Sequence, residues 1–74
     1  MLDKETVDCL ETLLKRGQEV HLWIVVPEAT THPGEFGALI NDPNELEFDD
    51  AEMEDCVYAP TIIEAINLAV RRWR

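Results

Sequence analysis

Eight carboxylate side chains lie within fourteen residues in the second half of the chain. Carboxylates at this density can bind cations or a positively charged surface. They are Asp42, Glu45, Glu47, Asp49, Asp50, Glu52, Glu54 and Asp55, and we call residues 42–55 the acidic segment. No Lys or Arg occurs between Gly17 and Val70 to neutralise them. Three interpretations follow: a solvated loop that keeps the protein soluble, a face that binds a basic partner, or a weak site for Ca²⁺ or Mg²⁺.

The spacing of these carboxylates differs from that of a calcium-binding EF-hand loop, which has Asp or Asn at positions 1, 3 and 5 and Gly at position 6. A loop that starts at Asp42 would have Leu46 at the fifth position. A zinc site is not expected either, because no two of the cysteines and histidines have the close spacing of zinc ligands. These residues are Cys9, His21, His32 and Cys56. The sequence therefore predicts no metal and no other cofactor.

Two further groups of residues could support catalysis or redox chemistry. Cys9 and Cys56 could form a disulfide in an oxidising compartment, but with no signal peptide a reduced pair of small apolar residues is expected. His32 lies beside Thr30 and Thr31, yet nothing in the pattern places a base against a nucleophile. The sequence therefore predicts a protein without enzymatic activity.

The overall charge restricts the class of partner. Sixteen acidic and six basic residues give a net charge of -10 over 74 residues, which repels nucleic-acid phosphates and anionic membranes. The longest apolar run, Leu22 to Val26, is far shorter than the roughly 20 residues of a transmembrane helix. A hydrophobic content of 46% is too high for a disordered acidic tail. We therefore expect one small domain over residues 1–74, located in the cytoplasm.

Residues 3–16 are predicted to form an amphipathic helix. Asp3 is a suitable N-cap, and Gly17 follows at the position where helices commonly end with a left-handed residue. The apolar side chains repeat at helical spacing. The predicted stripe is Val7, Leu10 and Leu14, with Leu13 beside it.

Two strands are predicted before the acidic segment and a third at its end. Residues 19–26 alternate between the two faces of a strand, and Pro27 ends it because proline cannot donate a ladder hydrogen bond. Residues 35–40 predict a second strand, antiparallel to the first. The acidic residues themselves fit an edge strand, a short helical turn or a loop. We expect the third strand between Glu52 and Tyr58.

Residues 60–73 are predicted to form the second helix, with Pro60 at the first helical position, where its missing N–H costs nothing. The apolar stripe of this helix is Ile62, Ile66, Ala69, Val70 and Trp73. Two amphipathic helices and a small antiparallel sheet predict an α+β domain in the order helix, strand, strand, strand, helix. The pattern leaves open whether the helices share one face of the sheet, and Trp23 indicates some cover on the other face of the first strand.

The order of the elements and a few residue motifs allow a comparison with known families. A helix that ends in Lys-Arg-Gly precedes a Trp-bearing strand at residues 20–25 and a second strand at residues 35–40. The acidic segment then leads through an Ala-Pro step into a helix that contains further alanines. Over roughly residues 12–73 this pattern resembles the small phage ABA sandwich domain family, although the final helix has Ile, Glu and Asn where that family more often has Cys, Arg and Ala. The resemblance implies a phage or prophage accessory protein, located in the cytoplasm of a bacterial host, and no particular activity.

These observations predict a small non-enzymatic binding protein, an inhibitor or adaptor of phage type. Its acidic face would dock on a basic host-defence or nucleic-acid-binding protein as a DNA mimic, as small acidic anti-CRISPR and anti-restriction proteins do. The alternative is a structural module that forms homodimers, because a thin domain gains buried core by pairing with a second copy. The aromatic residues available for that contact are Trp23, Phe36, Phe48 and Trp73.

Overall fold

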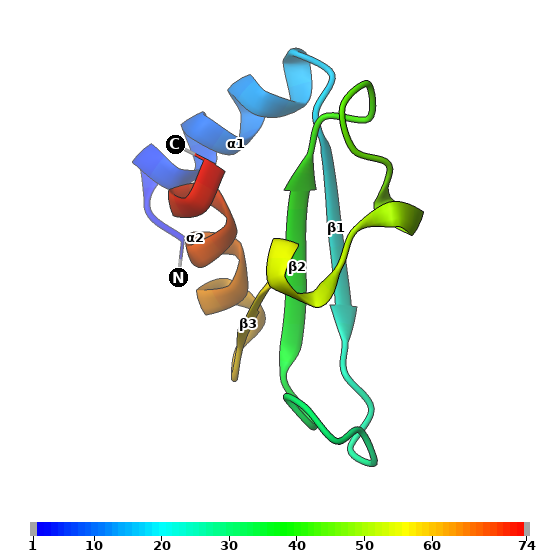
Figure 1. The fold of residues 1–74 in the computed structure, drawn as a ribbon. Helices are drawn as coiled ribbons and strands as arrows, with labels where there is room; N and C mark the ends of the chain where they lie inside the picture. Colours follow the sequence, from blue (N-terminus) through cyan, green and yellow to red (C-terminus); the bar gives the residue numbers. More distant parts are fainter. Residues whose placement is uncertain (1, 74) are drawn as a thin grey trace.

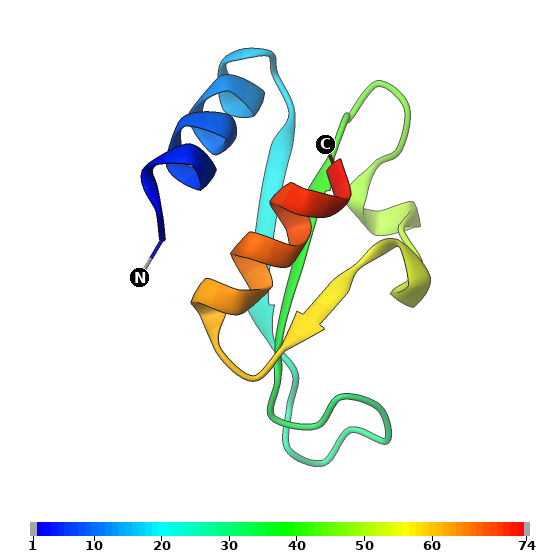
Figure 2. The ribbon, with the colours of Figure 1, turned by 90° about the vertical axis from the view of Figure 1, so that its left-hand side faces the viewer.

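The computed structural model of the chain describes residues 2–73. These residues form α1 (Lys4–Lys15), β1 (Glu19–Ile24), β2 (Phe36–Asn41), β3 (Val57–Ala59) and α2 (Ile62–Trp73), as Figure 1 shows. The strands make one antiparallel sheet, and both helices lie on the same face of it (Figure 2). The predicted α+β fold and its element order are therefore confirmed. None of the described helices is long and apolar enough to cross a membrane.

The N-cap and C-terminal signals predicted for α1 are present. The Thr6 N–H donates a hydrogen bond of 2.8 Å to Asp3 Oδ1, and Gly17 takes a left-handed φ of 95° after the helix. The buried face is rotated from the predicted stripe, because Leu13 is 4% exposed whereas Leu14 is 50% exposed. Adjacent leucines allow either face to be the apolar one, and packing against α2 and the sheet selects Leu13.

The register of the sheet places β2 between β1 and β3. Pairing of β1 with β2 runs from Glu19 opposite Asn41 to Ile24 opposite Phe36, and β3 pairs only with the first half of β2. The predicted end of the first strand at residue 26 is too late, because β1 ends at Ile24. The chain stays beside β2 for one more residue, since the Val25 N–H donates to Glu35 O at 2.8 Å.

The core lies between β2 and α2 and is built largely from small side chains. Ala38 of β2, Ala65 of α2 and Ala59 of β3 are each 2% exposed or less. Alanines on both surfaces let a helix lie close to a sheet, so the core is dense although the domain is thin. The other buried apolar members are Leu13, Ile40, Ala69 and Val70.

The start of α2 differs from the prediction. The helix begins at Ile62, and Thr61 caps it: Thr61 Oγ1 accepts a hydrogen bond from the Glu64 N–H at 3.2 Å. Pro60 therefore precedes the cap and does not occupy the first helical position. The threonine hydroxyl satisfies a free N–H of the first turn, which proline cannot do. The predicted stripe also missed Ala65, while Ile62 is 43% exposed.

Candidate functional site

The acidic segment folds into turns over the sheet. It begins with a turn in which Asp42 O accepts hydrogen bonds from the N–H groups of Glu45 and Leu46, both at 2.9 Å. Two 3₁₀ turns follow, Phe48–Asp50 and Met53–Asp55. Within the described chain no strand forms between β2 and β3, so the edge-strand interpretation of this segment is wrong and the helical-turn interpretation is confirmed.

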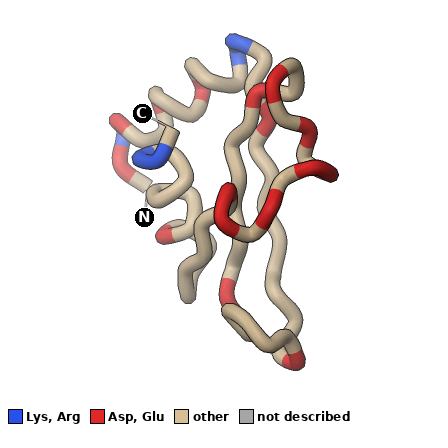
Figure 3. Tube along the Cα trace, viewed as in Figure 1, with Lys and Arg blue, Asp and Glu red and all other residues tan. Residues whose placement is uncertain are grey.

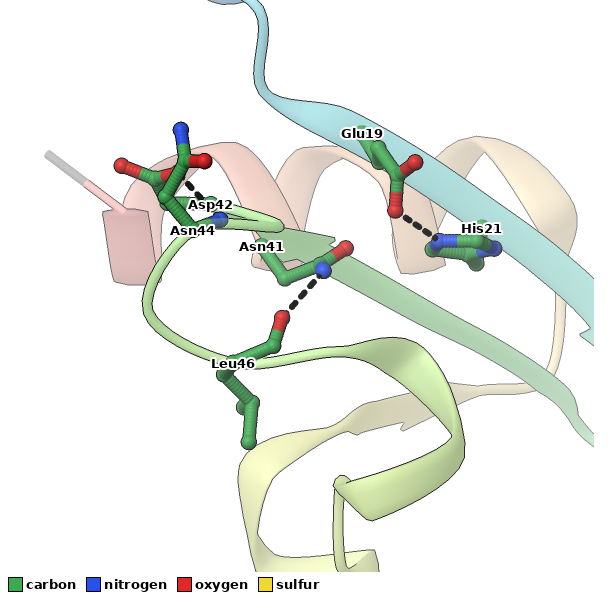
Figure 4. A network of polar contacts seen from close by, with 6 residues as sticks. All are labelled: Glu19, His21, Asn41, Asp42, Asn44 and Leu46. Carbon is green, nitrogen blue, oxygen red and sulfur yellow. Dashed lines mark hydrogen bonds and ion pairs between the residues drawn. The ribbon is translucent and has the colours of Figure 1, made fainter.

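Three of the eight carboxylates stabilise these turns. Asp42 Oδ1 accepts a hydrogen bond from the Asn44 N–H at 2.9 Å, which closes the first turn (Figure 4). Asp55 Oδ2 accepts one from the Glu52 N–H at 2.9 Å, and the Glu52 carboxylate accepts the N–H of Asp55 in return. Asp42 and Asp55 are half-buried. These bonds give the segment a defined shape.

Six of the eight carboxylates are exposed to solvent: Glu45, Glu47, Asp49, Asp50, Glu52 and Glu54. Among residues 2–73, none of the eight forms an ion pair with Lys or Arg. Figure 3 shows the reason, because the acidic residues follow one another along the segment while the basic residues gather at the helices. The segment therefore presents an uncompensated negative surface.

Phe48 anchors the middle of the segment to the sheet. Its ring stacks on His21 of β1 with a centroid separation of 4.1 Å and meets the edge of Trp23 at 5.5 Å. Trp23 in turn meets Tyr58 at 6.2 Å. The predicted cover on the second face of β1 is confirmed, and the aromatic residue that supplies it lies within the acidic segment.

Polar contacts anchor the two ends of the segment. At its start, the buried Asn41 donates through Nδ2 to Leu46 O at 2.6 Å (Figure 4). At its end, Arg72 of α2 donates to Glu54 O at 2.5 Å and to Cys56 O at 3.3 Å. A cavity of about 260 Å³ lies between these two anchors, beside β2 and the end of α2.

Sequence reasoning missed these anchoring roles. The bond from Arg72 to the carbonyl of Glu54, 18 residues earlier, has no local signal in the sequence. The anchoring role of Phe48 does have a local signal, because Phe48 is a large apolar residue among carboxylates. Its ring is expected to pack against another apolar surface. His21 lies in β1, and its side chain is under the Phe48 ring and 3.3 Å from Glu19 Oε1.

The other candidates for chemistry lie apart from one another. His32 stacks on Tyr58 at 4.2 Å with Nδ1 3.7 Å from Glu35, while the Thr31 hydroxyl faces Met53 Sδ at 3.8 Å. Cys9 and Cys56 are both free thiols. No group of three or more His, Cys, Asp or Glu side chains in the described part of the chain is arranged to hold a metal ion.

Cys56 lies at the junction of the acidic segment and β3, and burial raises the pKa of its thiol. A hydrogen bond with Tyr58 and the charge of Arg72 oppose that rise in pKa, and the charge of Asp55 adds to it. Cys56 Sγ is placed to donate to Glu52 O at 3.5 Å. The thiol therefore stays protonated to a higher pH than an ordinary cysteine, and the thiolate is the reactive form.

We expect Cys56 to react with a thiol reagent several-fold more slowly than a cysteine in a short unstructured peptide at pH 8. The rate should approach that of the peptide in denaturant, where burial is lost. The variant Cys9→Ser isolates the signal of Cys56 in this measurement. Equal rates for the folded protein and the peptide would contradict a raised pKa.

Comparison with known proteins gives no relative: no protein-family model, no curated protein and no solved structure matches the chain. The resemblance to the phage ABA sandwich family therefore stays a prediction.

Proposed function

We propose that this domain is a small non-enzymatic binding protein whose acidic segment docks on a basic surface of another protein. The observation that carries the proposal is the set of six exposed carboxylates in one ordered segment without a Lys or Arg partner in residues 2–73. Clustered charge of one sign costs stability through self-repulsion. A basic partner removes that cost, so binding relieves a repulsion that the free protein retains.

The anchors of the segment support the proposal because they fix the carboxylates before binding. Phe48 holds the middle of the segment, and Asn41 and Arg72 hold its ends. A preorganised charge array loses less conformational entropy on binding than a mobile loop would. Complementary charge also speeds the encounter with the partner.

The expected partner is a protein that handles nucleic acid, such as a host-defence nuclease, which the segment would inhibit by occupying its basic groove. One strand of DNA carries a phosphate about every 3.4 Å. Eight carboxylates in fourteen residues of extended chain would be spaced about 6 Å apart, and turns shorten that distance. The charge density therefore approaches that of a nucleic-acid strand, as expected for an anti-CRISPR or anti-restriction type of protein.

The test is capture of proteins from a bacterial lysate at low and at high salt, with a variant that carries Glu47→Gln, Asp49→Asn and Asp50→Asn. We expect a basic protein to be captured at low salt and released at high salt, where the Debye length falls to about 3 Å. The three substitutions should weaken its binding about 3- to 150-fold, because each exposed charge pair contributes about 0.2–1 kcal/mol.

The matched control carries Asp8→Asn, Glu11→Gln and Glu64→Gln, all exposed and all on the helices. Both variants have a net charge of -7, three units less negative than -10. Capture should survive in the control and fail in the acidic-segment variant. Equal loss in both would mean that only total charge matters, and a complex that resists high salt would contradict electrostatic docking.

A further inference from the structure

Three aromatic side chains gather on the face of the sheet that the helices leave open. Trp23 of β1, Gly37 of β2 and Tyr58 of β3 are paired across the three strands, so they share one face of the sheet. The alternate positions Ala38 and Ala59 belong to the core under the helices. Phe48 joins the aromatic face from the acidic segment, and a pocket of about 320 Å³ lies among the three rings.

Trp23 occupies the middle of this face because Gly37 has no side chain. Atoms of the indole ring stand where a Cβ of residue 37 would be, so the ring covers the centre of β2. Tyr58 is the next position across the sheet, on β3. The pairing of the strands therefore fixes the indole and the tyrosine side by side, and only Phe48 depends on the fold of the acidic segment.

The other two rings stand steeply against the indole of Trp23. The ring of Phe48 is inclined to it by 66° at a centroid separation of 5.5 Å, and the ring of Tyr58 by 82° at 6.2 Å. Each of them also stacks on a histidine: Phe48 on His21, and Tyr58 on His32. One face of each ring is thus covered, and the opposite face is left for the pocket. Rings in this arrangement form the sides of a cage.

The lining of the pocket favours a cation. The faces of aromatic rings carry the negative part of the ring quadrupole. Asp49 adds a carboxylate to the lining, and no Lys or Arg of the described chain takes part in it. Three aromatic rings offer few hydrogen-bond acceptors to a strongly hydrated lysine ammonium. They suit a cation whose charge is spread over methyl groups, as in the aromatic cages that bind quaternary ammonium ligands.

We propose that this pocket binds a methylated ammonium group, the group shared by choline and by trimethylated lysine side chains. The methyl groups contact the rings of Trp23, Phe48 and Tyr58, and the Asp49 carboxylate balances the charge. A pocket of about 320 Å³ is at the lower end of the range for small-molecule sites, so it fits a head group or one side chain. The site requires no docking of the acidic segment on a basic protein.

The first test is a titration of the protein with choline at constant ionic strength, followed by NMR at the indole N–H of Trp23. The variant Trp73→Phe assigns that signal. We expect a dissociation constant of about 1 mM, and binding at least about tenfold weaker for the neutral isostere in which a tert-butyl group replaces the trimethylammonium group. No shift at Trp23 in about 50 mM choline, or equal affinity for the isostere, would overturn the proposal.

Substitutions at the pocket test its components. Tyr58→Leu should weaken choline binding about fivefold because a ring is lost, while Tyr58→Phe should bind normally. Asp49→Asn should weaken it about threefold, and the control Asp50→Asn, which removes a neighbouring carboxylate outside the lining, should change it little. Amide spectra of each variant show whether the fold is intact. Equal weakening by Asp49→Asn and Asp50→Asn would mean that the segment attracts any cation and would contradict a specific pocket.

A second comparison identifies the source of the ammonium group. A peptide with one trimethyllysine that binds more tightly than choline would identify a protein as the source, and no gain over choline would identify a free small molecule. An unmodified lysine peptide that binds as tightly as the trimethylated one would refute the role of the methyl groups. Tyr58→Leu also separates this site from acidic docking, because it should weaken choline binding and leave salt-sensitive capture of a basic protein unchanged.

Discussion

Replacing Gly37 with alanine is expected to lower the free energy of unfolding by about 1–3 kcal/mol, the usual cost of overpacking. Gly37 of β2 lies opposite Trp23 of β1, and the indole ring covers it. A Cβ atom at this position would overlap the ring, with its nearest contacts well inside van der Waals distance. A domain of this size has roughly 4–11 kcal/mol of total stability, so the loss is a large share of it.

The matched control is Gly34→Ala, in the loop between β1 and β2. A Cβ at Gly34 meets no atom within 4 Å, but the residue has a φ of 75°. Its substitution should cost about 1–2 kcal/mol through backbone conformation alone. Thermal or denaturant unfolding of the two variants therefore separates steric overlap from backbone strain.

A double-mutant cycle identifies the cause of the Gly37 effect. In a Trp23→Ala background the ring is absent, and Gly37→Ala should then cost little or nothing. The coupling energy should approach the full cost of the single substitution, since the two residues are in direct contact. Additive costs in the double variant would show that the indole ring does not limit the size of residue 37.

The helix ends illustrate what the sequence predicts well. Asp3 and Gly17 act through hydrogen bonds and backbone angles within a few residues, so the local sequence is sufficient to place the first helix. The predicted start of the second helix at Pro60 was wrong, because Pro60 and Thr61 are both good residues near a helix N-terminus and the helix begins at Ile62. The Thr61 side chain forms the cap. Whether Pro60 or Thr61 marks the start of the helix depends on how the chain enters it from β3.

The buried faces show where local patterns are insufficient. Leu13 and Leu14 both extend an apolar stripe, and only contact with α2 and the sheet decides which of them is buried. The anchors of the acidic segment depend on similar long-range contacts. Arg72 reaches the carbonyl of Glu54, and no periodicity or composition connects those two positions. The carboxylates of the candidate site were predictable from the sequence, and the contacts that order them were not.

The second large effect is expected for Phe48→Ala, which should free the acidic segment while leaving every carboxylate in place. The Phe48 ring, 37% exposed, forms the aromatic contacts with His21 and Trp23. Each aromatic contact contributes about 0.5–1.5 kcal/mol beyond the burial of its surface. Without the ring, repulsion among the carboxylates favours displacement of the segment from the sheet.

We expect a protease that cuts after Glu and Asp to cleave Phe48→Ala within the acidic segment several-fold faster than the wild-type protein. Amide exchange should rise in the same residues, because local opening exposes backbone that is protected in the closed state. The control Met53→Ala removes a side chain that is 53% exposed and contacts the rest of the domain through Thr31. It should change cleavage little, and Phe48→Tyr should preserve the wild-type rate.

The same variant separates the number of charges from their arrangement. Phe48→Ala keeps the net charge of -10 and all eight carboxylates, yet a mobile segment must be ordered when it binds. If docking depends on a preformed array, affinity for the captured basic protein should fall about tenfold. This corresponds to a binding free energy that is weaker by roughly 1.4 kcal/mol, because the segment must be ordered on binding. Wild-type affinity in Phe48→Ala, combined with faster cleavage, would show that charge density alone is sufficient and that the anchors serve only the stability of the free domain.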